Sequence, residues 1–178
     1  MQTDERKNGG KGTCFEETVP AVRKRGWDLL IWGSVVLFTL LYLSLIFNNN
    51  VWTDEIFSVN LFRENFGQII MDTAEGVHPP LYYFLGRIFR LLFGDSLQVQ
   101  KILTIIPMSL TLVLGATKIR RFFGNGVSFL FLIFLGCIPC SMEYAVQIRM
   151  YSWALLCVTA CALAAWEIYR DGSGSEIW

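Results

Sequence analysis

The stretch that decides the fold runs from Leu29 to Phe47 and reads LLIWGSVVLFTLLYLSLIF. It carries no charged side chain, and its length is close to the roughly 20 residues that a helix needs to cross the hydrocarbon core of a bilayer. The run is too long for the apolar part of a signal peptide, and no small-residue cleavage site follows it. We therefore predict an uncleaved membrane anchor at 29–47.

Three further apolar runs lie in the second half of the chain. We predict spans at about 102–119, 123–141 and 151–168, the first of which contains Pro107, a residue type that membrane helices tolerate. The composition agrees, because 53% of the 178 residues are hydrophobic and 17% are charged, against about 25% charged residues in average globular proteins. The predicted fold class is an all-α integral membrane protein with four transmembrane helices.

The basic residues predict how the chain is oriented, since Lys and Arg favour the cytoplasmic side. With the N-terminus inside, the inner segments hold ten of the fifteen basic residues, including the cluster Lys118, Arg120 and Arg121. We expect a disordered cytoplasmic tail at 1–27, a membrane-embedded domain at 28–169 and an inner end at 170–178. Equal numbers of basic and acidic residues argue against nucleic acid as a partner. The absence of an organelle address favours a bacterial plasma membrane.

The predicted outer loop, 48–101, contains two amphipathic stretches. Apolar residues recur at helical spacing from Ile56 to Ile70, and a second stretch covers Leu81–Phe93. We predict two interfacial helices here. A short fifth span at 81–93 is the alternative, but it would place the Lys118 cluster outside, which the positive-inside rule disfavours.

An acidic pair follows the first span. Thr53 is the expected cap of the next helix, so that Asp54 and Glu55 would lie in its first turn, where the helix dipole stabilises negative charge. A carboxylate there can act as a general base or as a metal ligand. Acidic residues are also common in first turns without any catalytic role. The residues alone leave both interpretations open.

Further polar residues are expected on the same side of the membrane. His78, the only histidine, precedes two prolines that restrict the backbone. Lys101 and Arg149 open predicted spans, where snorkelling would explain either one alone. Together they form a cationic rim suited to a lipid-linked phosphate. By contrast, Cys137 and Cys140 have the spacing of a redox pair without its structural context, so we interpret them as packing residues.

Several motifs occur in a fixed order along roughly Trp27–Ile168. They are Asp54-Glu55, His78-Pro79-Pro80-Leu81-Tyr82-Tyr83, Leu92-Phe93-Gly94-Asp95-Ser96 and Gln147-Ile148-Arg149-Met150-Tyr151-Ser152. This ordered set resembles the N-terminal part of the membrane-embedded GT-C glycosyltransferases, a superfamily that includes the protein O-mannosyltransferases and the lipid A aminoarabinose transferases.

The resemblance implies transfer of a sugar from a polyprenyl-phosphate carrier to an acceptor hydroxyl of a glycan, lipid or protein on the outer face of the membrane. It implies that Asp54 is the general base and that Glu55 orients the acceptor or a divalent metal. The remaining roles it implies are carrier-phosphate binding by His78, Lys101 and Arg149, substrate binding by Tyr82, Tyr83, Gln147 and Tyr151, and a metal site that includes Glu55 and His78.

The chain departs from the family pattern in places. Lys101 stands where many relatives carry Arg, and Gln147 stands where many carry Glu. Family members are usually much longer, so we expect the gene product to continue beyond Trp178 or to be inactive alone. The alternative function is a non-catalytic membrane subunit or scaffold that binds lipid or a partner chain. A small transporter is disfavoured because the predicted spans are almost free of charge.

Overall fold

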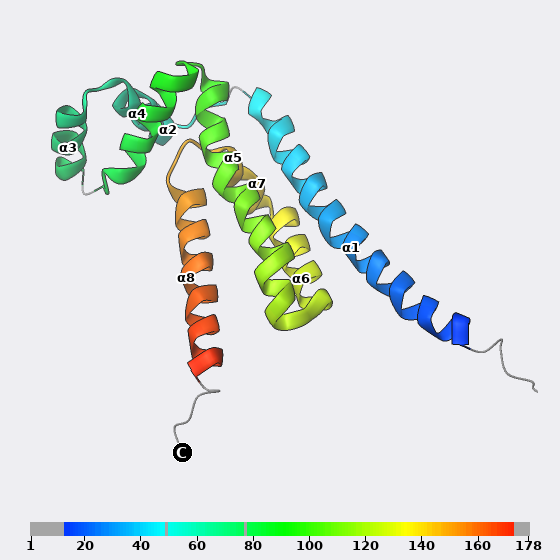
Figure 1. Ribbon diagram of the computed structural model, residues 1–178. Coiled ribbons are helices and arrows are strands. Elements are labelled where there is room, and N and C mark those ends of the chain that lie inside the picture. The colour runs from blue at the N-terminus through cyan, green and yellow to red at the C-terminus, as the bar shows by residue number, and fades with distance from the viewer. Residues whose placement is uncertain (1–12, 49, 77, 173–178) are drawn as a thin grey trace, which may run out of the picture.

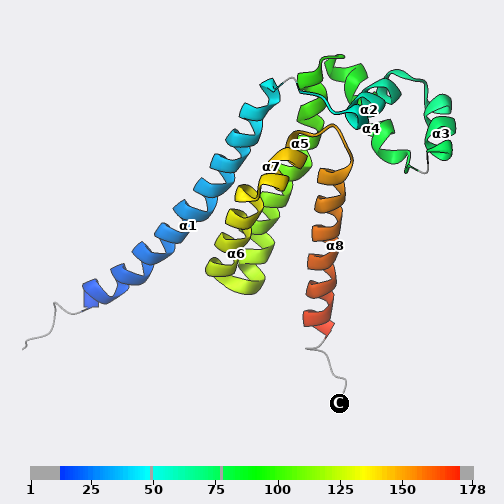
Figure 2. The same ribbon diagram turned by 180° about the vertical axis from the view of Figure 1, so that it is seen from behind.

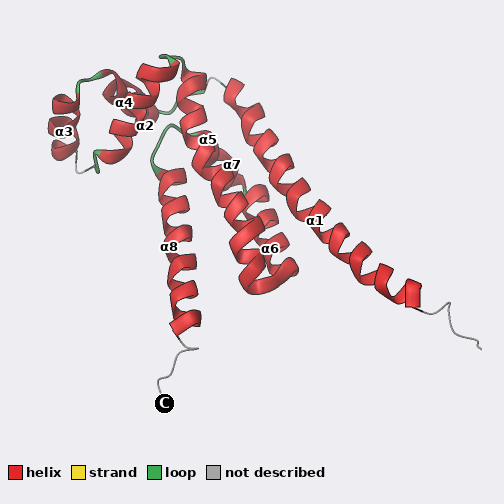
Figure 3. Cartoon of the chain, viewed as in Figure 1, coloured by secondary structure: helices red, strands yellow, loops and turns green. Residues whose placement is uncertain are grey.

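The computed structural model describes residues 13–48, 50–76 and 78–172, and these residues form helices and loops without a strand (Figure 3). The long helices are α1 (Thr13–Ser44), α5 (Leu97–Leu114), α6 (Arg120–Cys137) and α8 (Tyr151–Gly172). The shorter ones are α2 (Thr53–Arg63), α3 (Phe66–Glu75), α4 (Leu81–Phe93) and α7 (Pro139–Val146). A 3-10 turn, η1 (Leu45–Phe47), extends α1, and a π-helical turn, η2 (Gly115–Ile119), joins α5 to α6.

Three helical runs among the described residues are long and apolar enough to cross a membrane: Lys24–Phe47, Leu97–Cys137 and Tyr151–Arg170. The middle run reverses direction near Gly124, where φ is 87°. That conformation suits glycine, which has no Cβ to clash. As a result α5 and α6 lie side by side as a hairpin (Figures 1 and 2), across which the Ser128 hydroxyl donates to the Gly115 carbonyl over 2.8 Å. The prediction of an all-helical fold is confirmed for the described residues, and these three runs have the length and composition that the predicted spans require.

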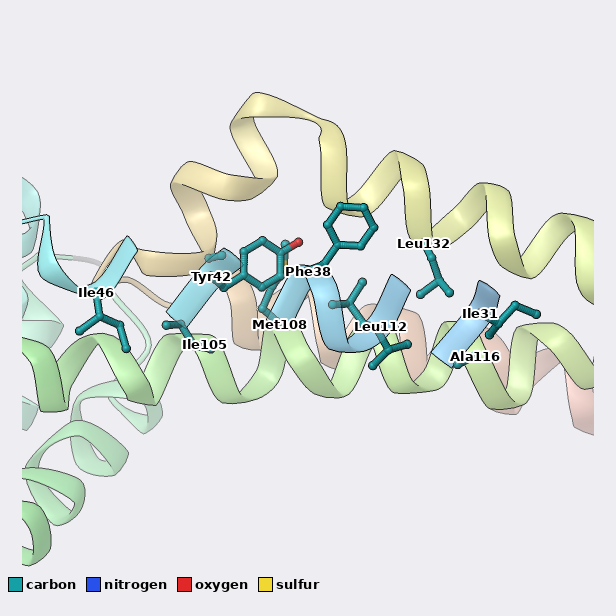
Figure 4. Packing of buried hydrophobic residues seen from close by; sticks show 11 residues of the cluster. Ile31, Phe38, Tyr42, Ile46, Ile105, Met108, Leu112, Ala116 and Leu132 are labelled. Atoms are coloured by element: carbon teal, nitrogen blue, oxygen red, sulfur yellow. The ribbon is translucent and has the colours of Figure 1, made fainter. Parts of the chain in front are cut away.

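One face of α1 packs along the α5–α6 hairpin (Figure 4). Its buried residues recur every three or four positions, as a helix with one buried face requires. They are Ile31, Val35, Phe38 and Tyr42, and Ile46 of η1 continues the same face. A Cβ at Gly136 of α6 would lie 2.4 Å from the Phe38 ring, so glycine permits this close approach. By contrast, α8 packs on α5, and only 11% of the residues in its most apolar stretch are buried.

Helices α2, α3 and α4 gather beyond one end of the long helices (Figure 1). We name residues 53–93 the outer cap, after this position beyond the long helices. A second hydrophobic cluster holds it together and joins it to Leu103 of α5 and to Ile148. Where α2 and α4 cross, a Cβ at Gly86 would lie 2.1 Å from the Phe62 ring. The cap is therefore a packed unit fixed to the end of α5.

The outer cap differs from the prediction in its first half. The expected helix across Ile56–Ile70 is broken, because Glu64 is extended and Asn65 caps a new helix by accepting the Gln68 backbone N–H over 2.9 Å. The cap therefore has three helices instead of two. Leu81–Phe93 forms one helix with the predicted bounds, and it is not among the described helices long enough to span a membrane.

The two chain ends also carried predictions. α1 begins at Thr13, inside the stretch predicted to be a disordered tail, and residues 1–12 lie outside the described part. α8 continues to Gly172, and 173–178 lie outside the described part as well.

Candidate functional site

Asp54 and Arg149 lie next to each other, although they are 95 positions apart in the sequence. Arg149 Nη2 is 3.8 Å from Asp54 Oδ2, and Arg149 Nη1 donates to the Asp54 backbone carbonyl over 3.3 Å. The Asp54 side chain is 68% exposed, whereas that of Arg149 is 8% exposed. Arg149 Nε has no hydrogen-bond partner among the described residues. The pair thus joins an accessible carboxylate to a nearly buried guanidinium with a free donor.

Aromatic side chains line the space around this pair. The Tyr83 ring centroid is 6.4 Å from that of His78 and 5.4 Å from that of Tyr82, and the Arg149 guanidinium carbon is 5.9 Å from the Tyr151 centroid. Ring contacts and the charge of Arg149 therefore link the Asp54–Arg149 pair to four predicted site residues, His78, Tyr82, Tyr83 and Tyr151. Phe57, which contacts both His78 and Tyr83, belongs to the same wall.

The two tyrosines act as neutral groups. Burial raises the pKa of the Tyr82 hydroxyl well above its ordinary value, neighbouring Tyr83 adds to the rise, and Arg149 opposes it. Burial also raises the pKa of Tyr83 despite the same guanidinium. Both hydroxyls therefore keep their protons at neutral pH. The Tyr82 hydroxyl has no partner among the described residues, which leaves a buried donor available to a ligand.

Glu55 has a different environment from Asp54. Its side chain is buried, Oε2 accepts the Trp52 backbone N–H over 2.8 Å, and Oε1 accepts the Ile148 backbone N–H over 2.7 Å. Trp52, and not Thr53 as predicted, occupies the cap position of α2, and Glu55 supplies the capping contact. Both carboxylate oxygens are therefore engaged with the backbone, and Glu55 holds the site together.

Lys101 and Gln147 line a separate cavity of about 360 Å³. It lies between the end of α1, the start of α2, α5 and α7, and its polar lining includes Asn48, Trp52, Glu55, Lys101, Glu143 and Gln147. Lys101 is 2% exposed and donates to the Asn48 backbone carbonyl. Lys101 thus shares the cavity lining with two carboxylates, while the contacts to Asp54 come from Arg149.

Some residues of these sites were not singled out in the sequence. Glu143 carries no local motif, and it lines the cavity because α7 packs against α5. Asp95 belongs to the Phe-Gly-Asp-Ser motif, but its contacts were not foreseen: it accepts from Arg63 Nε over 3.1 Å and from Arg90 Nε over 2.8 Å. Burial would raise the pKa of Asp95, but these hydrogen bonds outweigh burial and lower it. Arg63 and Arg90 each lie in the last turn of a helix, and this shared position was the signal that the sequence offered.

The two residues expected at a metal site make other contacts in this structure. Both Glu55 oxygens are occupied by backbone donors, and the His78 ring packs against Phe57 and Tyr83. Among the described residues no three His, Cys, Asp or Glu side chains gather as metal ligands would. We therefore derive no step through a metal. Cys137 and Cys140 carry free, exposed thiols.

Comparison with known proteins identifies no relative: no protein-family model, curated protein or solved structure matches the chain.

Proposed function

We propose that this chain carries part of the active site of a GT-C-type glycosyltransferase, which moves a sugar from a polyprenyl-phosphate carrier to an acceptor hydroxyl at the outer membrane face. The observation that supports the proposal best is the Asp54–Arg149 pair. An accessible carboxylate can take a proton, and a nearly buried guanidinium with a free Nε–H beside it can bind a phosphate oxygen.

The chemical step follows from these two groups. The acceptor oxygen attacks the anomeric carbon of the donor and forms the new glycosidic bond, while Asp54 takes the hydroxyl proton. The bond between the anomeric carbon and the phosphate oxygen breaks, and its electron pair leaves with the polyprenyl phosphate. Arg149 stabilises the negative charge that grows on that phosphate. Because the departing phosphate is a stable anion, no strong general acid is required.

The neighbouring side chains fit this assignment. Tyr151 lies beside Arg149, where a phosphate and its attached sugar would lie, and His78 contacts Tyr83 in the same wall. The free Tyr82 hydroxyl can donate to a ligand oxygen, and burial keeps it protonated. We assign carrier-phosphate binding to Arg149 with His78, and contacts to the substrate to Tyr82, Tyr83 and Tyr151.

We further propose four membrane crossings in a bacterial plasma membrane, with the N-terminus inside and the outer cap outside. The contacts at the α5–α6 turn support this topology, because Arg120 bonds Asp28 of α1 and Lys118 bonds Glu167 of α8 over 2.8 Å. Asp28 of α1, Glu167 of α8 and the α5–α6 turn therefore lie close together, on the side of the long helices away from the outer cap (Figure 1). This side of the long helices is rich in Lys and Arg, as the positive-inside rule favours for the cytoplasmic face.

The test is Asp54→Asn in the full-length gene product, assayed with a radiolabelled polyprenyl-phosphate sugar. We expect the transfer rate to fall by about 100-fold or more, with no loss of folded protein because the side chain is exposed. Glu75→Gln, an exposed carboxylate at the end of α3, is the matched control and should keep the wild-type rate. An unchanged rate in Asp54→Asn would refute the role of the base.

The second candidate function is a non-catalytic membrane subunit that binds lipid or a partner chain. The observation that favours it is the low burial of α8, whose apolar side chains Val158 and Ile168 are 68% and 74% exposed. Such surface requires lipid or further helices around it. This function predicts that Asp54→Asn leaves the protein's cellular role intact, so the same variant separates the two candidates.

A further inference from the structure

The cavity beside Lys101 holds two kinds of polar groups, fixed ones and free ones. Lys101 is tied to the Asn48 carbonyl, and Glu55 is tied to two backbone N–H groups. In contrast, the Gln147 Oε1 atom is buried without a hydrogen-bond partner among the described residues. A buried carbonyl oxygen without a partner is costly. The lining therefore includes side chains that are already fixed and one residue, Gln147, whose carbonyl oxygen still lacks a hydrogen bond within the described part of the chain.

The charges of the lining disfavour an anionic ligand. Lys101 supplies one positive charge, while Glu55 and Glu143 supply two negative charges. A phosphate placed here would meet two carboxylates and only one ammonium group, whose donors are already partly used. Repulsion between the phosphate and these two carboxylates opposes binding. The polyprenyl phosphate is thus better matched to Arg149 than to this cavity.

A hydrocarbon chain is also a poor occupant. It would cover the charged side chains and the Gln147 amide without offering hydrogen bonds, and that desolvation is unfavourable. The volume of about 360 Å³ is near the lower end of ligand pockets, which span about 300–1,000 Å³. The space suits one small ring better than a long lipid tail.

A neutral polyhydroxylated ring fits all of these groups. Its hydroxyls can donate to Gln147 Oε1 and to the Glu143 carboxylate, and they can accept from the Lys101 hydrogens not used by Asn48. Its C–H face can lie on the indole of Trp52, which lines the cavity and is 61% exposed. We propose that this cavity binds a single neutral sugar ring, through Trp52, Glu143, Gln147 and Lys101.

This inference rests on the proposed function and deepens it. Glu55 lines the cavity, and Asp54 is the preceding residue, so a bound ring would lie at the turn that carries the proposed base. The ring can come from an acceptor glycan or from the sugar of the lipid-linked donor. Both have the same hydroxyl and C–H chemistry, and the test distinguishes them.

The test measures equilibrium binding of methyl hexopyranosides to the full-length protein in nanodiscs, by calorimetry or saturation-transfer NMR. The panel contains the methyl α-glycosides of glucose, mannose and galactose, with inorganic phosphate as the anionic comparison. We expect saturable binding of at least one glycoside, weakened tenfold or more by Trp52→Ala and by Gln147→Ala. Gln68→Ala, on the exposed side of α3, is the matched control and should bind as the wild type does.

Two further arms separate the alternatives. Glycoside binding to the wild type is measured without any lipid-linked donor, so a failure of the catalytic proposal does not affect this measurement. In Asp54→Asn, a lipid-linked donor that displaces the glycoside identifies the ring as the donor's sugar, and simultaneous binding identifies it as the acceptor's. Absence of saturable glycoside binding would overturn the proposal, as would binding that neither cavity variant weakens or that inorganic phosphate displaces.

Discussion

The carboxylate of Glu55 accepts the backbone N–H of Ile148 over 2.7 Å, which joins the start of α2 to the loop before α8. Its other oxygen accepts the Trp52 N–H. One buried side chain thus fixes two segments 93 positions apart. Asp54, its neighbour, is exposed and free to meet a substrate. Adjacent acidic residues therefore have separate tasks, one in holding the site and one in the proposed chemistry.

Glu55→Ala tests the holding role. It would leave two backbone N–H groups without their acceptor, at about 1–3 kcal/mol for each donor that stays buried and unpaired. We expect a clear loss of thermal stability of the full-length protein in detergent, with Glu55→Gln less affected because its amide keeps one acceptor oxygen. Asp54→Asn should unfold at the wild-type temperature. Equal stability of Glu55→Ala and the wild type would contradict the structural role.

Much of the helical layout could be predicted from the sequence, because apolar runs and helical periodicity are local signals. Leu81–Phe93 and the start of α8 at Tyr151 are examples. The break at Glu64 could not be predicted in this way, because apolar spacing continues from Phe62 to Phe66 and Asn65 decides the outcome through one capping bond.

The candidate site was predictable only in part. The carboxylate pair and Arg149 stood out by residue type, and the predicted membrane topology put them on one side. Which carboxylate has the structural role depends on which one accepts the backbone N–H of Ile148. Residue types do not indicate where a backbone donor will lie, so this could not be predicted. The cavity was hidden for a similar reason, since Glu143 joins it through the path of α7.

Gly86→Ala tests the packing of the outer cap. Its Cβ would lie 2.1 Å from Phe62 Cε1, so either the ring or α4 must move. We expect a loss of about 1–3 kcal/mol, the usual range for an overpacked core, seen as a lower midpoint of thermal unfolding. Gly33→Ala is the control, because a Cβ there meets no atom within 4 Å. Equal midpoints for the two variants would show that α2 and α4 do not pack closely at Phe62.

Arg149→Lys tests the phosphate assignment. Lysine keeps the positive charge but loses the forked geometry that matches phosphate oxygens. We expect the KM for the polyprenyl-phosphate sugar to rise by about tenfold, the effect of about 1.4 kcal/mol in binding free energy. Arg121→Lys, whose side chain is 64% exposed, should leave the kinetics unchanged. A wild-type KM in Arg149→Lys would remove Arg149 from the carrier site.

The topology can be tested with single cysteines in a variant that lacks the native ones. Asn50 lies in the loop before the outer cap, and Gly126 follows the α5–α6 turn at the opposite end of the long helices (Figure 1). Both residues are exposed. On intact cells, a membrane-impermeant thiol reagent should label Asn50→Cys and leave Gly126→Cys unlabelled until the cells are opened. The reverse pattern would place Asp54 and the cavity in the cytoplasm, where an outer-face acceptor could not reach them.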